Sequence, residues 1–306
     1  MKRFFLKVLV LLLLSGIGVV VWTAAGRPPV RMVWQYGFSY HPEPTGKVVP
    51  YEDVEFVEIG PGCFLMGSNQ GAEGGDFLGR WCARLGLPWG DQPKASDEMP
   101  VHWVEFQRGF FIARTEVTNE QFEAFAPGHE RHMYTPGDRD PVVNVSWVEA
   151  REYCAWLSKK SGLPIRLPSE AEWECACRAG SNREFCFGDE EHWLELYAWF
   201  GQNSDLHAHE VGSKRANAFG LHDLHGNALE WCEDTYHPSY IGAPAIGTPW
   251  TDGGTRHYSD SPDRIYRGGS FYIPASFSRA AHRTRSEPEF RLFSLGFRLA
   301  FSHAEK

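Results

Sequence analysis

A glycine-rich segment near the end of the chain gathers several polar side chains that could do chemistry. The stretch RGGSFYIPASFSRAAHR runs from Arg267 to Arg283 and opens with two glycines, which let a backbone approach another group closely. It holds no thiol, no acidic pair and no close histidine cluster. The candidate catalytic residues are Ser270, Tyr272, Ser278, Arg279 and His282. The alternative is structural: arginines paired with carboxylates, a serine satisfying the backbone of a tight turn and a hydrogen-bonded histidine.

Two histidine pairs are further candidates for metal ligands. His129 and His132 form an HxxH pattern in GHERHM, and His207 and His209 form an HxH pattern in DLHAHE. Imidazole is a common metal ligand, but a lone pair in an expected loop does not complete a site. We therefore expect neither copper nor iron in this chain, and the pairs remain the alternative site for such an ion.

Seven cysteines are spread over the chain: Cys63, Cys82, Cys154, Cys175, Cys177, Cys186 and Cys232. In an oxidising compartment some of them can form disulfides, and the odd number leaves at least one free or bonded elsewhere. Cys175 and Cys177 point in different directions if they lie on a helix, so we expect no disulfide between them. No CxxC pair indicates a zinc site. The other interpretation is that several cysteines are small buried hydrophobic residues.

The composition is typical of a globular protein and argues against nucleic-acid binding. The chain has 306 residues, of which 42% are hydrophobic and 14% aromatic, enough for one large domain or two small ones. Its net charge is -9, and it shows no basic stripe for a nucleic acid to bind.

Three helices are predicted by one device, the capping box, in which Ser or Thr caps the helix and Glu or Gln reaches back. The motifs are TNEQ from Thr118, SWVE from Ser146 and SEAE from Ser169. The helix after Ser146 has an apolar face at helical spacing, and Gly162 is expected to end it.

Strand patterns precede and separate these helices. VEFVEIGPGCFLMGS predicts a hairpin that turns at Pro61 and Gly62. HWVEFQRGFFIARTEVT predicts two strands on either side of Arg108 and Gly109, and FLGRWCARLGLPWG predicts an insertion with a short helix. Little periodicity follows Asn182. The expected fold class is therefore α+β with low regular secondary structure.

The N-terminal residues 1–25 are expected to direct export. Three positive charges precede an apolar run that reaches Ala25, a pattern typical of a signal peptide or a single membrane anchor. Both interpretations put the rest of the chain in the periplasm or outside the cell, because the positive charges stay in the cytoplasm. Residues 26–50 are expected to be a linker and residues 51–306 the folded domain.

Several motifs in register resemble the formylglycine-generating enzyme family, also called the sulfatase-modifying-factor family. They begin at Pro141 (PVVNVSWVEAREYCAWLSKKSGLPIRLPSEAEWECACRAG), Asn217 (NAFGLHDLHGNALEWCED), Arg267 (RGGSF) and Leu295 (LGFRLA), and FVEIGPGCFLMGS and RTEVTNEQFEAF match the family's N-terminal part. The resemblance covers roughly Glu55 to Ser302. It implies a single domain with a C-type-lectin-like α+β fold.

The same resemblance implies that RGGSF opens the family's active-site loop. Founding members oxidise a sulfatase cysteine to formylglycine with two cysteines that hold copper(I), an ion suited to soft thiolates. The matching positions here are Ile273 and Ser278. Isoleucine cannot bind a metal, and a serine hydroxyl is a poor copper(I) ligand. We therefore expect the founding reaction to be absent, although Ser270 matches a serine of the family's oxygen site.

HDLHGNALEW resembles the calcium loop of the family. Carried over residue by residue, the ligands are the side chains of Asp223 and Glu230 and the carbonyl oxygens of Gly226 and Ala228. Oxygen-only ligands from a short loop suit calcium, which is the one metal we expect. Leu229 departs from the family's usual tryptophan. The alternative is that Asp223 and Glu230 only cap turns.

Two classes of function follow from the resemblance, and whether the chain is an enzyme is left open. The favoured one is an exported protein that acts on or binds a protein or peptide partner, in maturation or regulation, without copper-thiolate cysteine oxidation. Its lectin-like fold could then serve as a non-catalytic binding module. The other is a periplasmic metal-dependent oxidoreductase of the same family with different site chemistry.

Overall fold

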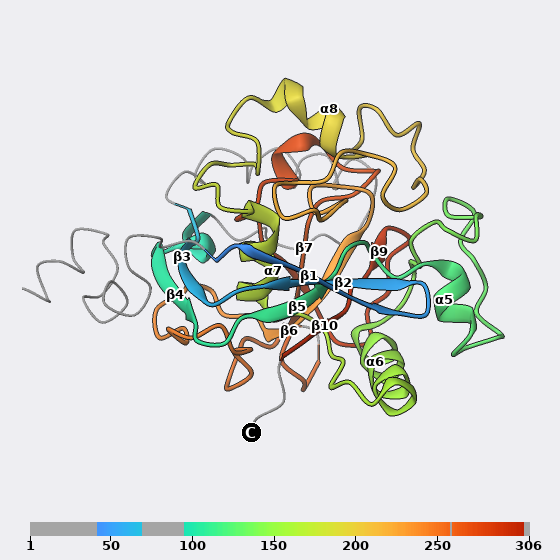
Figure 1. Ribbon diagram of the computed structural model, residues 1–306, viewed down its shortest axis with the longest axis horizontal. Coiled ribbons are helices and arrows are strands. Elements are labelled where there is room, and N and C mark those ends of the chain that lie inside the picture. The colour runs from blue at the N-terminus through green and yellow to red at the C-terminus, as the bar shows by residue number, and fades with distance from the viewer. Residues whose placement is uncertain (1–41, 69–94, 258, 303–306) are drawn as a thin grey trace, which may run out of the picture.

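The computed structural model describes residues 42–68, 95–257 and 259–302 (Figure 1). Within these three ranges no helix is long and apolar enough to cross a membrane. The expected export segment at residues 1–25 and the expected insertion at residues 77–90 lie outside the described residues.

A four-stranded antiparallel sheet joins the two ends of the described chain (Figure 1). Its strand order is β1 (Pro44–Tyr51), β2 (Val54–Ile59), β5 (Phe110–Ala113) and β10 (Ala300–Phe301). β1 begins inside the residues expected to form a linker, because it finds a pairing partner in β2. The ordered chain therefore extends ahead of residue 51.

Two smaller sheets complete the β structure of the described ranges. One pairs β3 (Gly62–Met66) with β4 (His102–Phe106), and the other has the order β8 (Thr284–Ser286), β7 (Arg264–Arg267), β6 (Leu229–Thr235) and β9 (Leu295–Gly296). The expected hairpin between β2 and β3 is wrong. Both edges of β2 are already occupied by β1 and β5, so β3 pairs with β4 instead.

The capping boxes correctly predict α5 (Asn119–Glu123), α6 (Trp147–Ser161) and α7 (Glu170–Arg178), whereas α8 (Leu194–Tyr197) has no capping box. Short 3-10 turns lie at η1 (Ala95–Glu98), η2 (Glu191–Trp193) and η3 (Ala275–Phe277). Thr118, Ser146 and Ser169 each form both hydrogen bonds of the box. Gly162 ends α6 in the left-handed conformation, with a φ of 73°.

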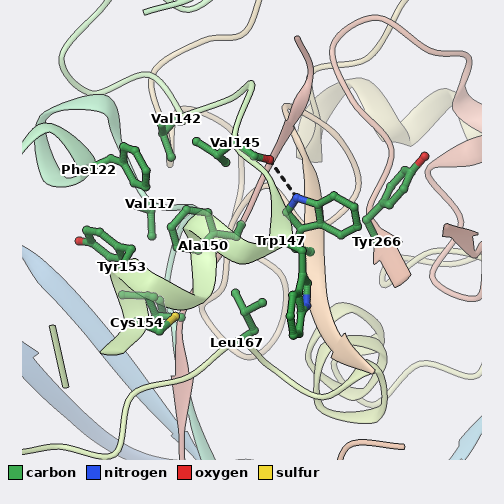
Figure 2. Close-up of a cluster of buried hydrophobic side chains, with 14 of the residues drawn as sticks. Val117, Phe122, Val142, Val145, Trp147, Ala150, Tyr153, Cys154, Leu167 and Tyr266 are labelled. Carbon is green, nitrogen blue, oxygen red and sulfur yellow. Dashed lines mark hydrogen bonds between the residues drawn. The ribbon is translucent and has the colours of Figure 1, made fainter. Parts of the chain in front are cut away.

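The apolar face of α6 builds the main core. Trp147, Ala150, Tyr153, Cys154 and Leu157 are the buried residues of this helix. Figure 2 shows several of these side chains packed with labelled residues of neighbouring segments, among them Val117, Phe122 and Leu167. The apolar residues that recur at helical spacing in the sequence are therefore the buried face of α6.

Helix α7 is buried on all sides, although it carries three glutamates and an arginine. Glu170, Trp173 and Glu174 follow the i, i+3, i+4 spacing that puts side chains on one face of a helix. Buried charges need partners, and this face finds them in arginines that lie far away in the sequence. The same face lies against both loops that carry the candidate site.

Candidate functional site

Arg267 ties the glycine-rich loop to α7. Its buried guanidinium donates to Glu174 and to the carbonyl oxygens of residues 280–282, on the returning limb of the loop. Burial alone would raise the pKa of Glu174, but Arg178 and Arg267 outweigh it and hold that pKa below its usual range. The carboxylate is therefore charged, and the ion pair brings the two limbs of the loop together.

The two glycines are needed where the loop leaves β7. Gly268 and Gly269 have φ angles of 103° and 75°, in a region that favours glycine. A Cβ atom on Gly269 would lie 2.4 Å from Ser278 Oγ, and one on Gly268 would lie 3.1 Å from the Trp173 ring. The close approach expected from the sequence is thus to the loop's own returning limb and to α7.

The first limb of the loop is fixed by the segment at residues 201–204. A backbone N–H of that segment donates to the Ile273 carbonyl at 2.9 Å, and its serine donates to the Phe271 carbonyl at 2.5 Å. Ser270 is fully buried, and Tyr272 is partly buried next to it. Ile273 is 6% exposed and belongs to the main apolar cluster. An aliphatic packing residue therefore stands at the first of the two positions carried over from the family's cysteines.

Ser278, at the second position, lies against a buried histidine that the sequence did not single out. The Ser278 hydroxyl is buried and has no hydrogen-bond partner among the described residues. His225 Nδ1 lies 2.7 Å from the Ser278 carbonyl, and the Cys186 N–H donates to His225 Nε2 at 3.1 Å. A carbonyl oxygen can only accept, so the ring proton is on Nδ1. Burial lowers the pKa of His225 to about 4, so the ring is neutral at pH 7.

Arg279 and His282 both lie near Glu98. Arg279 donates two hydrogen bonds to that carboxylate, at 2.8 and 3.0 Å. His282 packs edge-on against Phe277, with ring centroids 4.8 Å apart, and its Nδ1 lies 3.9 Å from a Glu98 oxygen. Burial, and after it Arg279 and Arg267, holds the pKa of His282 well below its usual range. His282 is therefore a neutral packed ring at pH 7.

Arg283 closes the loop against α7. It makes a bidentate pair with Glu170 at 2.6 and 2.9 Å and donates to the Asp97 carbonyl at 2.6 Å. Bidentate pairs of this kind fix geometry as well as charge. The structure thus brings the five catalytic candidates onto one loop, and its arginines are engaged by carboxylates of the fold itself.

The six described cysteines are all free, and Cys82 lies outside the described residues. The disulfides considered from the sequence are therefore not formed among them, and the expectation that Cys175 and Cys177 stay unpaired is confirmed. Five of the six are buried. Burial, the main cause, raises the pKa of Cys63 to about 11 and that of Cys186 to about 12, so these thiols stay protonated at neutral pH.

The HDLHGNALEW loop leaves three oxygen atoms without a hydrogen-bond donor. Asp223 is 1% exposed; its Oδ2 accepts the Gly212 N–H at 2.7 Å, while its Oδ1 is buried with no partner in the described ranges. The carbonyl oxygens of Gly226 and Ala228 accept no hydrogen bond from those ranges either. Carboxylate and carbonyl oxygens are the ligands that calcium prefers.

Glu230, the fourth residue carried over to this loop, is engaged by Arg298. The guanidinium donates to both carboxylate oxygens at 2.6 and 2.7 Å, and Trp173 Nε1 donates at 2.7 Å. No three His, Cys, Asp or Glu side chains of the described residues gather as metal ligands. Asp223 and the two carbonyls therefore have the ligand chemistry that calcium prefers, whereas Glu230 is already engaged by Arg298 and Trp173.

A third carboxyl group, Glu116, joins Asp223 and Glu230 beside this loop. It is fully buried and accepts the Ala228 N–H at 2.9 Å. Burial first, and then Asp223 and Glu230, raise the pKa of Glu116 well above its usual range. Burial also raises the pKa of Asp223. Three carboxylates meet one guanidinium here, so a divalent cation would balance the cluster when all three are ionised.

The histidine pairs take part in packing. His129 lies edge-on to Phe122, and His132 stacks on Phe293. In the second pair, His209 stacks on Trp199 with ring centroids 3.7 Å apart. Neither pair gains a third side chain as a metal ligand in the described ranges.

A cavity of about 220 Å³ opens beside the returning limb of the loop. Arg279 and Ala281 of the loop line it together with residues of α7 and of the segment that follows. The full lining is Leu65, Gly67, Ser68, Val101, Arg178, Asn182, Arg183, Glu184, Asp189, Arg279 and Ala281. Charged side chains of both signs line this cavity.

Sequence reasoning missed Glu116 and His225. Both stand inside segments that carried the resemblance: Glu116 lies two residues before the helix cap in RTEVTNEQ, and His225 lies within HDLHGNALEW. A carboxylate and an imidazole in such motifs are a usable signal. Their burial and their partners, however, depend on contacts more than 50 residues away along the chain.

Comparison with known proteins adds relatives of stated activity. Residues 45–303 match the sulfatase-modifying factor enzyme 1-like domain. The chain is 30% identical to the formylglycine-generating enzyme of Streptomyces coelicolor over 292 residues, covering 74% of this chain and 87% of that protein. It is 28% identical to hercynine oxygenase of Mycobacterium tuberculosis over 235 residues, covering 75% of this chain but only 48% of that protein.

A solved structure extends this similarity to the fold. PvdO from Pseudomonas aeruginosa superposes with a TM-score of 0.69 at 32% identity, covering 85% of this chain and 99% of its own. Together with the three sheets and short helices described above, this match confirms the expected α+β fold.

In a chelator-treated sample, we expect the free energy of unfolding to fall as the pH rises from about 4 to 7. The folded-state pKa of Asp223 is raised above its ordinary value of 3.8, mainly by burial. Its contribution is therefore fully present below pH 3.8 and is lost as the pH rises through the folded pKa. Asp234, whose pKa burial raises to about 7, adds to the same trend.

Denaturant unfolding at several pH values measures this slope. Asp223→Asn can keep an oxygen for the Gly212 N–H but carries no charge, so its stability should fall less steeply than that of the wild type. Asp205→Asn, at an exposed position, is the matched control and should keep the wild-type slope. Identical slopes for the two variants would contradict the prediction.

Proposed function

Because the chain belongs to the formylglycine-generating enzyme family, we propose that it is an exported member that binds or acts on a partner protein in maturation or regulation. The family's domain is named for the modification of sulfatases, which are themselves proteins. A protein or peptide partner is thus the class of ligand that the family suggests for this chain. The proposal excludes copper-thiolate oxidation of a cysteine.

The identity and packing of the residues at positions 273 and 278 are the observation that carries this proposal. Ile273 packs into the apolar cluster, and Ser278 presents a buried hydroxyl below Gly269. Neither can supply the soft thiolate that copper(I) requires. The arginines of the loop form ion pairs with Glu98, Glu170 and Glu174 of the fold.

The surface for the partner is proposed at the tip of the loop and in the adjoining cavity. Ser276 is the exposed residue of the returning limb. The cavity of about 220 Å³ beside it has half-exposed to exposed residues on its rim, such as Asn182 and Arg183. A rigid loop next to a hollow with charges of both signs suits the binding of an extended peptide segment.

The alternative is a metal-dependent oxidoreductase of the same family with different site chemistry. It is favoured by the similarity to a hercynine oxygenase, and by the neutral His225 that lies next to Cys177 and Cys186 under the loop. Metal analysis of the purified chain separates the two functions: copper or iron near one per chain supports the oxidoreductase, and calcium alone supports the partner-binding role.

Calcium bound in the HDLHGNALEW loop is part of the proposal. Asp223 and the carbonyls of Gly226 and Ala228 would hold it, with Glu230 sharing an oxygen, and the ion would neutralise the carboxylates around Arg298. It would act structurally, since Trp173 links Glu230 to α7 and so to the glycine-rich loop. Export is proposed on the charged and apolar N-terminal pattern alone.

We expect no formylglycine when the chain is incubated with copper(I), oxygen and a peptide that carries the sulfatase cysteine motif. Mass spectrometry of the peptide measures the product. The Streptomyces coelicolor enzyme under the same conditions is the positive control. Formylglycine formed by this chain above the level of a protein-free sample would overturn the exclusion of the founding reaction.

We expect a photo-crosslinking residue at Ser276 to capture one discrete protein partner in the native host, whereas the same residue at exposed Glu190 captures none. Asn182→Trp, which fills the cavity from its rim, should abolish the Ser276 adduct while leaving the melting temperature unchanged. Gel shifts followed by mass spectrometry give the readout. The same set of adducts from both positions, or an adduct unaffected by Asn182→Trp, argues against this surface.

Calcium should raise the melting temperature of the chelator-treated chain, and the rise should be larger at pH 8 than at pH 5. Binding to the folded state alone adds about 2.7 kcal/mol at a hundredfold excess over the dissociation constant. The increment grows with pH because calcium binds the ionised form of Asp223, whose pKa is raised. Asp223→Asn should lose most of the increment and Asp205→Asn none. An equal increment in both variants would place the ion elsewhere.

A further inference from the structure

A second cavity, of about 200 Å³, lies where the turn between β1 and β2 meets α5 and α6. It shares no lining residue with the cavity beside the glycine-rich loop. Its wall is apolar and aromatic, formed by Tyr51, Val54, Tyr153, Trp156 and Leu157, and the rest of its lining is Glu52, Asp53, Glu120, Gln121 and Ala124. We call this cavity the α5–α6 pocket.

The rim of the α5–α6 pocket carries more negative than positive charge. Glu52 pairs with Lys160 at 2.8 Å, and Asp53 accepts a hydrogen bond from Gln121 at 3.0 Å. Glu120 has no ion-pair partner in the described part of the chain. Three carboxylates therefore meet a single ammonium group, and the pocket attracts a further cation.

Tyr153 provides an unused polar group inside the same pocket. The residue is 1% exposed and lines the cavity, and its hydroxyl makes no hydrogen bond with any described residue. In Figure 2 this hydroxyl points away from the other labelled side chains of the core cluster. Burial, followed by Cys154, Asp53 and Glu52, raises the pKa of Tyr153, so the group stays a neutral hydroxyl that can accept an N–H.

Lys160 of the protein itself shows how an ammonium group can be held at this rim. Its Nζ lies 5.1 Å from the centroid of the Trp156 ring as well as 2.8 Å from Glu52. An ammonium over a tryptophan face and beside a carboxylate is a favourable cation–π arrangement. Lys160 is 44% exposed, so it sits at the mouth and leaves Tyr153, Asp53 and Glu120 to another ligand.

We propose that the α5–α6 pocket binds the side chain of a lysine from a partner protein. The aliphatic stem lies along Trp156 and Leu157, as long charged side chains do on apolar surfaces. The ammonium donates to the Tyr153 hydroxyl and is neutralised by Asp53 and Glu120. This site is independent of the proposed loop surface, and it gives the chain a second point of contact.

The test uses three acetylated, amidated tripeptides, Gly-Lys-Gly, Gly-norleucine-Gly and Gly-acetyllysine-Gly, titrated against the full chain by ligand-observed NMR. The lysine peptide should bind at least about tenfold more tightly than the other two, because only it carries the charge. Equal binding of the norleucine peptide would overturn the proposal in favour of an apolar ligand. A fourth peptide, Gly-Arg-Gly, tests the choice of cation, and its equal or tighter binding would overturn the choice of lysine.

Four variants and one control locate the site, each checked by its melting temperature. Tyr153→Phe keeps the packed ring but should weaken the lysine peptide about threefold to tenfold by removing one acceptor. Glu120→Gln and Asp53→Asn should each weaken binding of the lysine peptide, and Glu190→Gln, at an exposed position just before η2, should not. Lys160→Met should strengthen binding severalfold, because it removes the competing ammonium. Unchanged binding in Tyr153→Phe and Lys160→Met together would overturn the assignment to this pocket.

Discussion

The rest of the structure depends on one buried interaction, the ion pair between Arg267 and Glu174 of α7. Both side chains are fully buried, so the pair depends on its hydrogen-bond geometry: the guanidinium also donates to three carbonyl oxygens of the returning limb. Replacing such a pair by apolar groups can be neutral, but removing one partner alone costs about 3–5 kcal/mol. The glycine-rich loop therefore keeps its shape only while both charges are present.

Helix α7 extends this constraint to the whole candidate site. Glu170 holds Arg283, Trp173 holds Glu230 with its partner Arg298, and Glu174 holds Arg267. One helix face thus meets both the glycine-rich loop and the HDLHGNALEW loop. A change of charge in either loop is transmitted to the same buried helix, which explains why the two loops are best understood as one unit.

Helix-capping motifs, which depend on neighbouring residues, predicted α5, α6 and α7. Strand pairing and the burial of site residues depend on contacts between distant segments, so the sequence did not predict them. The capping boxes at Thr118, Ser146 and Ser169 and the stop at Gly162 depend on neighbours in the chain, and all were confirmed. The hairpin expected after Ile59 was wrong because strand pairing depends on which edges distant strands already occupy. Glu116 and His225 were missed for the same reason: their burial and partners come from segments far away in sequence.

The contacts of Arg267 on the returning limb have a consequence for how such a protein can change over generations. The guanidinium binds carbonyl oxygens of residues 280–282, and every amino acid has one. These three contacts therefore do not depend on the side chains of residues 280–282. Side chains at those three positions can therefore change while the contacts that hold the loop remain, so one architecture can be inherited by lineages that differ in their chemistry.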